Sequence, residues 1–156
     1  MRKSCRLFLI SLFGLLLLEG PLSASTYPLA HILPKEATDK LAKEGINSTE
    51  ELLEKGATPA GRNKLVKATG LAAKQVNEWI HLCDLVRIKG VGPQMTKLLH
   101  AAGVTSVAQL RQRQANSLYK AVMKANEKEK ITQNPPSEKH LEHWIDQAKT
   151  LKIVLR

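Results

Sequence analysis

The chain has 156 residues, a formal net charge of +10, 43% hydrophobic residues and only 4% aromatic ones. This composition is too apolar for a disordered chain and too charged for a multi-span membrane protein. The scarcity of Trp, Tyr and Phe also argues against stacking platforms for single-stranded nucleic acid. Because Ala, Leu, Lys, Glu and Gln are frequent and β-branched runs are scarce, we expect one helical domain of ordinary size.

Residues 1–24 have the pattern of a cleaved signal peptide. Basic residues precede a twelve-residue apolar core, Leu7 to Leu18, and small residues offer a cleavage site after Ala24 or Ser25. This core is shorter than the ~20 residues of a membrane-spanning helix. We therefore expect a periplasmic or secreted bacterial protein with no integral membrane span in the mature chain. The alternative is a membrane anchor formed by residues 7–18.

The mature chain would keep 21 Lys and Arg residues against 13 Asp and Glu residues, a net charge of +8, and a single cysteine, Cys83. No intramolecular disulfide can then form. Cys83 lies in an apolar stretch with Trp79, Ile80 and Leu85, which predicts a buried structural thiol. An intermolecular disulfide is the alternative.

The mature chain repeats itself. The matching pairs are Gly45 with Gly103, Ser48 with Ser106 and Leu52 with Leu110 at an offset of 58 residues, and Trp79 with Trp144 at an offset of 65. The second copy therefore carries seven extra residues, which we place around residues 127–136. Trp79 and Trp144 should be equivalent core residues.

We expect a lead-in over residues 25–34 and one compact all-α domain over residues 35–152. The domain would consist of two tandem helix-hairpin-helix-like repeats, at about 35–86 and 87–152, each with about four short helices and no strand.

Glycines and capping residues mark the helix ends. Helices should end at Gly45, Gly70 and Gly103, as a left-handed terminal residue requires. The expected helix starts are the capping boxes Ser48–Glu51 and Ser106–Gln109, the pair Thr58-Pro59, and Ser137. The polar stretch 126–136, which ends in two prolines, predicts an exposed loop.

A hairpin between the two copies is the strongest candidate site. Gly90 and Gly92 flank Val91 and permit a tight turn with positive φ, while Val91 points into the core. The flanking amides would then face outward at a helix N-terminus, where backbone N–H groups and the helix dipole favour an anion. Nearby lysines would add Coulomb attraction. The predicted nucleic-acid-binding residues are Lys89, Gly90, Val91, Gly92, Gln94 and Lys97.

This hairpin resembles the helix-hairpin-helix family, whose pattern is apolar-x-Gly-apolar-Gly-x-x-x-Ala. The matching residues are Ile88, Gly90, Val91 and Gly92, whereas the family's Ala falls on Thr96. The resemblance implies a hairpin that grips the sugar–phosphate backbone of DNA without reading base sequence. Pro93 removes one amide next to the turn and so one potential donor.

The chain also resembles a bacterial family, domain of unknown function 4332, over roughly residues 32–152. The residues that carry this resemblance are Ala60-Gly61-Arg62, Trp79-Ile80, the segment 84–88, Gly90-Val91-Gly92 and Trp144-Ile145. The resemblance implies tandem helix-hairpin-helix units. It implies the fold more firmly than an activity, because the family has no settled function.

The first copy departs from the hairpin pattern. At the offset of 58, Gly90 and Gly92 fall on Ile32 and Pro34, and Glu36 would repel a phosphate. Charge follows the same asymmetry: residues 25–82 hold 8 basic and 7 acidic residues, and residues 83–156 hold 13 basic and 6 acidic ones. A polyanion should therefore prefer the second half.

The sequence contains no catalytic constellation, metal site or cofactor motif. His140 and His143 lack further ligands, and Asp84 is expected to pair with Arg87 or cap a helix rather than act as a base. We expect no enzyme activity, no cofactor and no small-molecule substrate.

Other basic residues are expected to have structural or solvent-exposed roles. Arg62 should form an ion pair with Glu50, Glu51 or Glu54, the alternative being a contact with a phosphate or carboxylate ligand. The exposed lysines of the second copy are expected to be Lys120, Lys124, Lys128 and Lys130.

The leading functional hypothesis is an exported, non-enzymatic binding protein that contacts the nucleic-acid backbone through Gly90-Val91-Gly92. The main alternative is a protein-interaction or scaffolding module of the cell envelope, without nucleic acid. A third hypothesis is adsorption of the basic second half to anionic lipid or polysaccharide.

Overall fold

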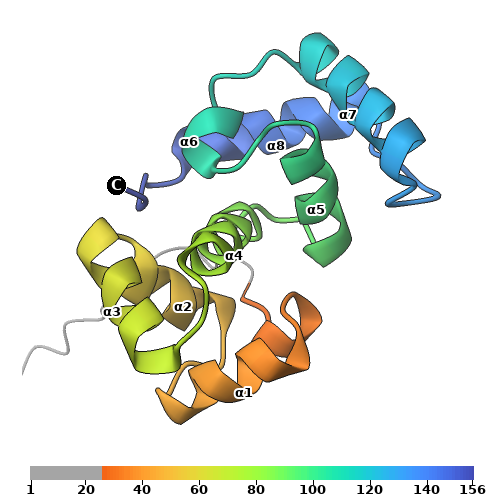
Figure 1. Cartoon of the computed structure of the whole chain (residues 1–156). Coiled ribbons are helices and arrows are strands. Elements are labelled where there is room, and N and C mark those ends of the chain that lie inside the picture. Colours follow the sequence, from red (N-terminus) through yellow and green to blue (C-terminus); the bar gives the residue numbers. More distant parts are fainter. Residues whose placement is uncertain (1–25) are drawn as a thin grey trace, which may run out of the picture.

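The computed structural model describes residues 26–156, which form eight α-helices and one short 3-10 helix (Figure 1). The predicted signal peptide lies outside these residues. Within them, no helix has both the length and the apolar character needed to cross a membrane.

The α-helices form two groups of four, as the repeat predicts. The 3-10 helix η1 (Leu29–His31) precedes the first group, which is α1 (Lys35–Lys43), α2 (Thr49–Gly56), α3 (Pro59–Thr69) and α4 (Ala73–Leu85). The second group is α5 (Pro93–Ala101), α6 (Val107–Leu110), α7 (Ala115–Glu129) and α8 (Glu138–Thr150). The bounds of α5 and α8 follow those of α1 and α4 at the offsets of 58 and 65 residues. The all-α prediction is confirmed.

The two predicted capping boxes form differently. At α2, the hydroxyl of Ser48 accepts from the N–H of Glu51, whose carboxylate accepts from the N–H groups of Asn47 and Ser48. These two backbone bonds hold the pKa of Glu51 below its ordinary value. At α6, Ser106 accepts from the N–H of Gln109 in the same way, but the side chain of Gln109 bonds to Thr105 instead of Ser106.

Each repeat encloses its own hydrophobic core. Trp79 is 9% exposed in the first core and Trp144 is 6% exposed in the second, so their predicted equivalence is confirmed. Helix α4 runs between the two halves of the molecule (Figure 1) and serves both cores. Cys83 and Val86 pack in the first core, whereas Leu85 packs in the second.

The two ends of the described chain complete the first core. Leu29, Ile32 and Leu33, which lie within the predicted lead-in, are buried in the first core. The tail after α8 returns to the first repeat, where Val154 and Leu155 pack against this core. The first repeat therefore includes segments from both ends of the described chain.

The seven extra residues lengthen both α7 and the connection that follows it. Residues 126–129 are helical, so the prediction of an exposed loop over 126–136 is wrong at its start. Thr132 and Pro136 in the connection itself are buried. The side-chain amide of Asn126 donates to the carbonyl of Thr132 and accepts from its N–H, which ties the connection to the end of α7.

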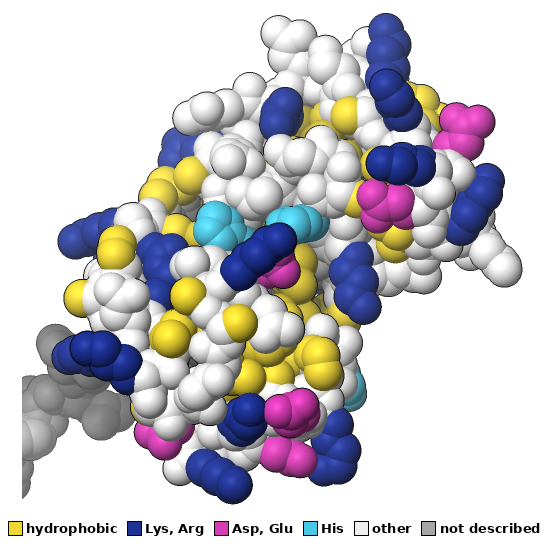
Figure 2. All heavy atoms as spheres, viewed as in Figure 1, with side chains coloured by type: hydrophobic (Ala, Val, Ile, Leu, Met, Phe, Trp, Pro, Cys, Tyr) yellow, Lys and Arg dark blue, Asp and Glu magenta, His cyan; other side chains and the backbone are white. Residues whose placement is uncertain are grey.

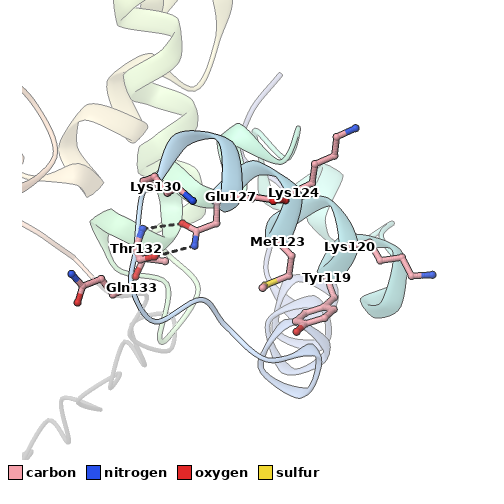
Figure 3. A pocket seen from close by; sticks show the side chains of 9 residues that line it. Tyr119, Lys120, Met123, Lys124, Glu127, Lys130, Thr132 and Gln133 are labelled. Carbon is pink, nitrogen blue, oxygen red and sulfur yellow. Dashed lines mark hydrogen bonds between the residues drawn. The ribbon is translucent and has the colours of Figure 1, made fainter.

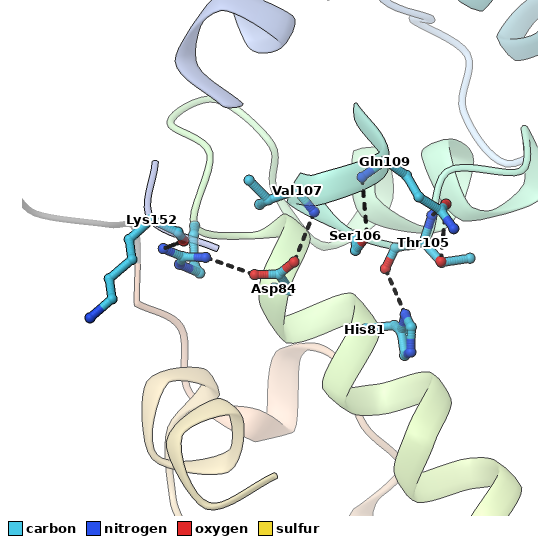
Figure 4. Close-up of polar contacts among 8 residues, drawn as sticks. His81, Asp84, Thr105, Ser106, Val107, Gln109 and Lys152 are labelled. Atoms are coloured by element: carbon cyan, nitrogen blue, oxygen red, sulfur yellow. Dashed lines mark hydrogen bonds and ion pairs between the residues drawn. The ribbon is translucent and has the colours of Figure 1, made fainter. Parts of the chain in front are cut away.

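A buried ion pair joins the two repeats (Figure 4). One carboxylate oxygen of Asp84 lies 2.7 Å from the guanidinium nitrogen Nη1 of Arg87. The other accepts a 2.8 Å hydrogen bond from the N–H of Val107 at the start of α6. Arg87 also donates to the carbonyl of Lys152 in the tail. Nearby, Nδ1 of His81 lies 3.0 Å from the carbonyl oxygen of Thr105. The prediction that Asp84 pairs with Arg87 or caps a helix is confirmed, since it does both.

Replacing Asp84 should destabilise the fold far more than replacing an exposed partner of another ion pair. We expect Asp84→Ala to lower the free energy of unfolding by about 3 kcal/mol, because Arg87 and a backbone N–H lose a buried acceptor. Asp146→Ala, which removes the exposed ion pair with Lys149, should change it by less than about 1 kcal/mol. Urea unfolding followed by circular dichroism measures both, and equal effects would contradict the role given to Asp84.

Candidate nucleic-acid interface

The predicted hairpin is the turn between α4 and α5. The N–H of Ile88 donates to the carbonyl of Leu85, and the N–H of Val91 donates to that of Ile88. Both Ile88 and Val91 are fully buried in the second core. These two apolar residues fix the turn to the core and leave Lys89 and Gly90 exposed between them.

The two glycines of the turn have different backbone roles. Gly90 has φ +92°, in the region that favours glycine, as the sequence predicts. Gly92 has φ −81° and ψ −179°, an extended conformation open to any residue, and it is the N-cap of α5. The expected positive φ is therefore found at one glycine only.

Gln147 of α8 anchors the turn from the side. Its side-chain carbonyl accepts from the N–H of Lys89 at 3.0 Å, and its side-chain amide donates to the carbonyl of Lys89 at 3.1 Å. Sequence reasoning missed this residue. Its position three residues after Trp144 on the same helix is a weak signal, because it only places the two side chains on neighbouring parts of one face.

Several backbone donors at the turn remain open. Among residues 26–156, the N–H groups of Gly90 and Gly92 have no hydrogen-bond partner, nor do those of Gln94 and Met95 in the first turn of α5. Unpaired N–H groups at a helix start carry partial positive charge. Lys89 and Pro93 offer no such donor, because the N–H of Lys89 is bonded to Gln147 and Pro93 has none.

The predicted site residues do not all lie at this open surface. The side chain of Val91 is enclosed in the core. The amide of Gln94 donates to the carbonyl of Ile131, and its oxygen is 3.4 Å from the hydroxyl of Thr132. Lys97 lies in a groove of about 390 Å³ whose lining includes the carboxylates of Glu78 and Glu129. Lys89, which directly precedes Gly90 in the chain, is the predicted lysine beside the open amides.

The first repeat builds a different turn at the equivalent position. Ile32, the counterpart of Gly90, has φ −117° and is buried, and Pro34 replaces Gly92 as the N-cap of α1. One contact is shared: Thr96 donates its hydroxyl to the carbonyl of Gly92, as Thr38 does to Pro34. A threonine at the family's alanine position is thus accommodated by a local hydrogen bond.

The excess positive charge does not form a continuous stripe on the face seen in Figure 2. Lys and Arg side chains are spread over both halves of this face, with Asp and Glu among them. Lys120, Lys124, Lys128 and Lys130 are exposed, as predicted. On this face, an electrostatic attraction to a polyanion would therefore be diffuse, and a specific contact requires local donors.

An open hollow of about 1000 Å³ lies along α7 (Figure 3). Its lining combines the partly apolar side chains of Tyr119 and Met123 with Lys120, Lys124 and Lys130. Asn126 and Thr132 of the lining bond to each other, and Glu127 adds a carboxylate to a lining that holds three lysines.

The buried titratable groups have structural environments. Burial, reinforced by the negative charge of Asp84, raises the pKa of Cys83 to about 12, which keeps the thiol protonated and unreactive. The prediction of a buried structural thiol is confirmed. In residues 26–156, no group of three or more His, Cys, Asp or Glu side chains is placed to hold a metal ion.

Arg62 differs from its expected role. Instead of pairing with a glutamate of α2, it donates to the backbone carbonyls of Ala57, Thr58 and Arg156. Because the N–H of Arg156 also donates to Ala57, the tail is held against the start of α3 from both sides. The prediction of an ion pair with a glutamate is wrong. Arg62 instead binds backbone carbonyls, one of which belongs to the returning tail, and sequence spacing does not reveal where the tail lies.

Comparison with known families finds a match over most of the described chain. The family described as a domain of unknown function, DUF4332, matches residues 31–151. This chain belongs to the DUF4332 family. The match runs from the last residue of η1 to the end of α8, and it includes the α4–α5 turn. No curated protein and no solved structure matches the chain. Membership in DUF4332 thus agrees with the predicted resemblance and assigns no activity.

The two glycines should respond differently to substitution. We expect Gly90→Ala to lower the free energy of unfolding by about 1–2 kcal/mol, because φ is positive and a β-carbon would lie 3.2 Å from Nε1 of Trp144. Gly92→Ala should be nearly neutral, since φ is ordinary and the nearest atom, Oη of Tyr27, would be 3.9 Å away. Denaturant unfolding of both variants checks the turn geometry, and a larger loss at Gly92 would refute it.

Cys83 should resist thiol reagents in the folded protein. In a chain carrying Cys5→Ser, we expect no reaction with Ellman's reagent at pH 8 under native conditions and complete reaction in denaturant. The folded thiol, with a pKa of about 12, keeps its proton above the ordinary thiol pKa of 9.0, where the unfolded thiol loses it. This group therefore lowers folding stability as the pH rises from 9 towards 12. Rapid native labelling would contradict the burial.

Proposed function

We propose that this protein is an exported, non-enzymatic binding module that contacts the phosphate backbone of nucleic acid without reading base sequence. The observation that carries the proposal is the α4–α5 turn. At a partly exposed helix start, beside the exposed Lys89, it presents the N–H groups of Gly90 and Gly92, which have no partner among residues 26–156. Backbone amides at a helix N-terminus are suited to phosphate oxygens.

The chemistry of the turn favours sequence-independent contact. Its open donors are main-chain amides, and these and the ammonium group of Lys89 recognise phosphate rather than base edges. The side chains of Val91 and Gln94, which could otherwise have contacted bases, are committed to the core and to the α7–α8 connection. A helix-hairpin-helix unit of this kind would bind DNA weakly and through few phosphates.

The proposal assigns binding to the second repeat. Its counterpart in the first repeat has neither glycine, and Ile32 is buried there. The second half also holds 13 basic residues against 6 acidic ones, compared with 8 and 7 in the first half. Together with the predicted N-terminal signal peptide, this asymmetry favours a protein that meets nucleic acid outside the cytoplasm.

A second candidate function is supported by the groove of about 390 Å³ that α4, α5 and the end of α7 line together. Its lining combines Trp79 and Ile131 with Glu78, Lys97 and Glu129. An apolar surface with charges of both signs suits a protein partner better than a polyanion. An envelope scaffold that uses this groove would bind its partner with little dependence on salt.

A charge reversal at the turn tests the main proposal. We expect Lys89→Glu to weaken binding to duplex DNA about tenfold or more at low salt and to reduce the slope of log affinity against log salt by about one. Lys67→Glu, at an exposed lysine of α3 in the first repeat, makes the same change in net charge and is the matched control.

Fluorescence anisotropy with a labelled duplex over a salt series measures both variants. Equal losses for the two would indicate general charge attraction instead of a site at the turn. Absence of wild-type binding at low salt would overturn the nucleic-acid proposal and leave the protein-interaction function to be tested.

A further inference from the structure

A buried tryptophan directs its one polar atom at the turn between α4 and α5. Trp144 in α8 is 6% exposed, and its indole ring packs in the second core. A β-carbon at Gly90 would lie 3.2 Å from its Nε1, so this edge of the ring lies against the turn. The N–H edge of the indole therefore faces the glycine with the unpaired amide.

The indole N–H has no internal acceptor. Trp144 makes no hydrogen bond to any residue from 26 to 156, although every fully enclosed side-chain nitrogen or oxygen in that part of the chain has a partner. Its Nε1 is consequently at the surface, beside Gly90, while the rest of the ring is buried. Within the turn, the carbonyl of Lys89 already accepts from the side-chain amide of Gln147. An N–H in this position is available to an acceptor from outside.

Gly90 keeps this donor uncovered. Any side chain at that position would place its β-carbon next to Nε1, whereas glycine leaves the space open. The equivalent pair in the first repeat is Trp79 and Ile32, where a branched side chain stands in place of the glycine. Only the second repeat combines the buried tryptophan with a glycine turn.

We propose that the indole N–H of Trp144 and the backbone N–H groups of Gly90 and Gly92 form one donor cluster that binds a single phosphate group. This inference rests on the proposed function, for which the phosphate group is a phosphodiester of nucleic acid. All of the donors in the cluster are neutral, and they bind the anion through directed hydrogen bonds. The cluster therefore adds affinity without adding to the salt dependence, which Lys89 supplies.

Matched tryptophan variants test the role of the indole. We expect Trp144→Phe, which keeps an aromatic ring and removes the N–H, to weaken duplex DNA binding about tenfold, as for loss of a hydrogen bond to a charged acceptor. The slope of log affinity against log salt should stay unchanged. Trp79→Phe, the equivalent change in the first repeat, should bind within about twofold of the wild type. Circular dichroism of both variants verifies that the helices persist.

A second test observes the indole of Trp144 itself and leaves that residue unchanged. In proton–nitrogen correlation spectra, Trp79→Phe assigns the two indole signals. We expect the indole signal of Trp144 to shift when duplex DNA or inorganic phosphate is added, and the signal of Trp79 to stay in place.

The outcomes separate this inference from the proposed function. If DNA binds with the expected dependence on Lys89 but neither the Trp144 signal nor the Trp144→Phe affinity changes, the indole is not a donor and the nucleic-acid function stands. If inorganic phosphate shifts the Trp144 signal while DNA does not bind, the donor cluster stands and its phosphate comes from another source. If neither probe shifts the signal, the inference is overturned.

Discussion

The arrangement of the two repeats depends on the buried carboxylate of Asp84 near the end of α4. One of its oxygens binds Arg87 and the other binds the backbone N–H that begins α6. Helix α4 already contributes side chains to both cores, so this interaction fixes the second repeat to the helix that the repeats share. Arg87 extends the link to the returning tail through the carbonyl of Lys152. A buried charge is tolerable here because each oxygen has a partner.

This link also determines the position of the candidate site. Arg87 begins the turn that continues through Lys89 to Gly92, and Gln147 of α8 holds the same turn from the other side. The backbone at Gly90 is therefore supported by α4 and α8 together, while its N–H stays unpaired within the described chain. A rigid support with open donors is the arrangement expected of a preorganised binding surface, because little ordering remains to be done when a ligand arrives.

Repeat symmetry explains why one copy is suited to this role and the other is not. Trp79 and Trp144 occupy equivalent core positions, and Thr38 and Thr96 make equivalent helix-start bonds. The divergence lies in the turn, where Ile32 adds to the first core at the position at which Gly90 leaves the chain exposed. One copy thus contributes packing, and the other keeps the conformational freedom that an exposed glycine provides.

The sequence by itself determined the helical class, the two repeats and most helix ends, because apolar periodicity, Ser and Thr caps and left-handed glycines act over a few residues. It also located the α4–α5 turn and the burial of Val91. Only the tertiary structure decided the partners that come from distant segments: Gln147 at the turn, Trp144 against Gly90, and the tail carbonyl that Arg62 binds. It likewise placed Lys97 near acidic side chains and committed Gln94 to the α7–α8 connection. These contacts depend on how α8 and the tail pack after the chain has turned back, and no local spacing encodes that geometry.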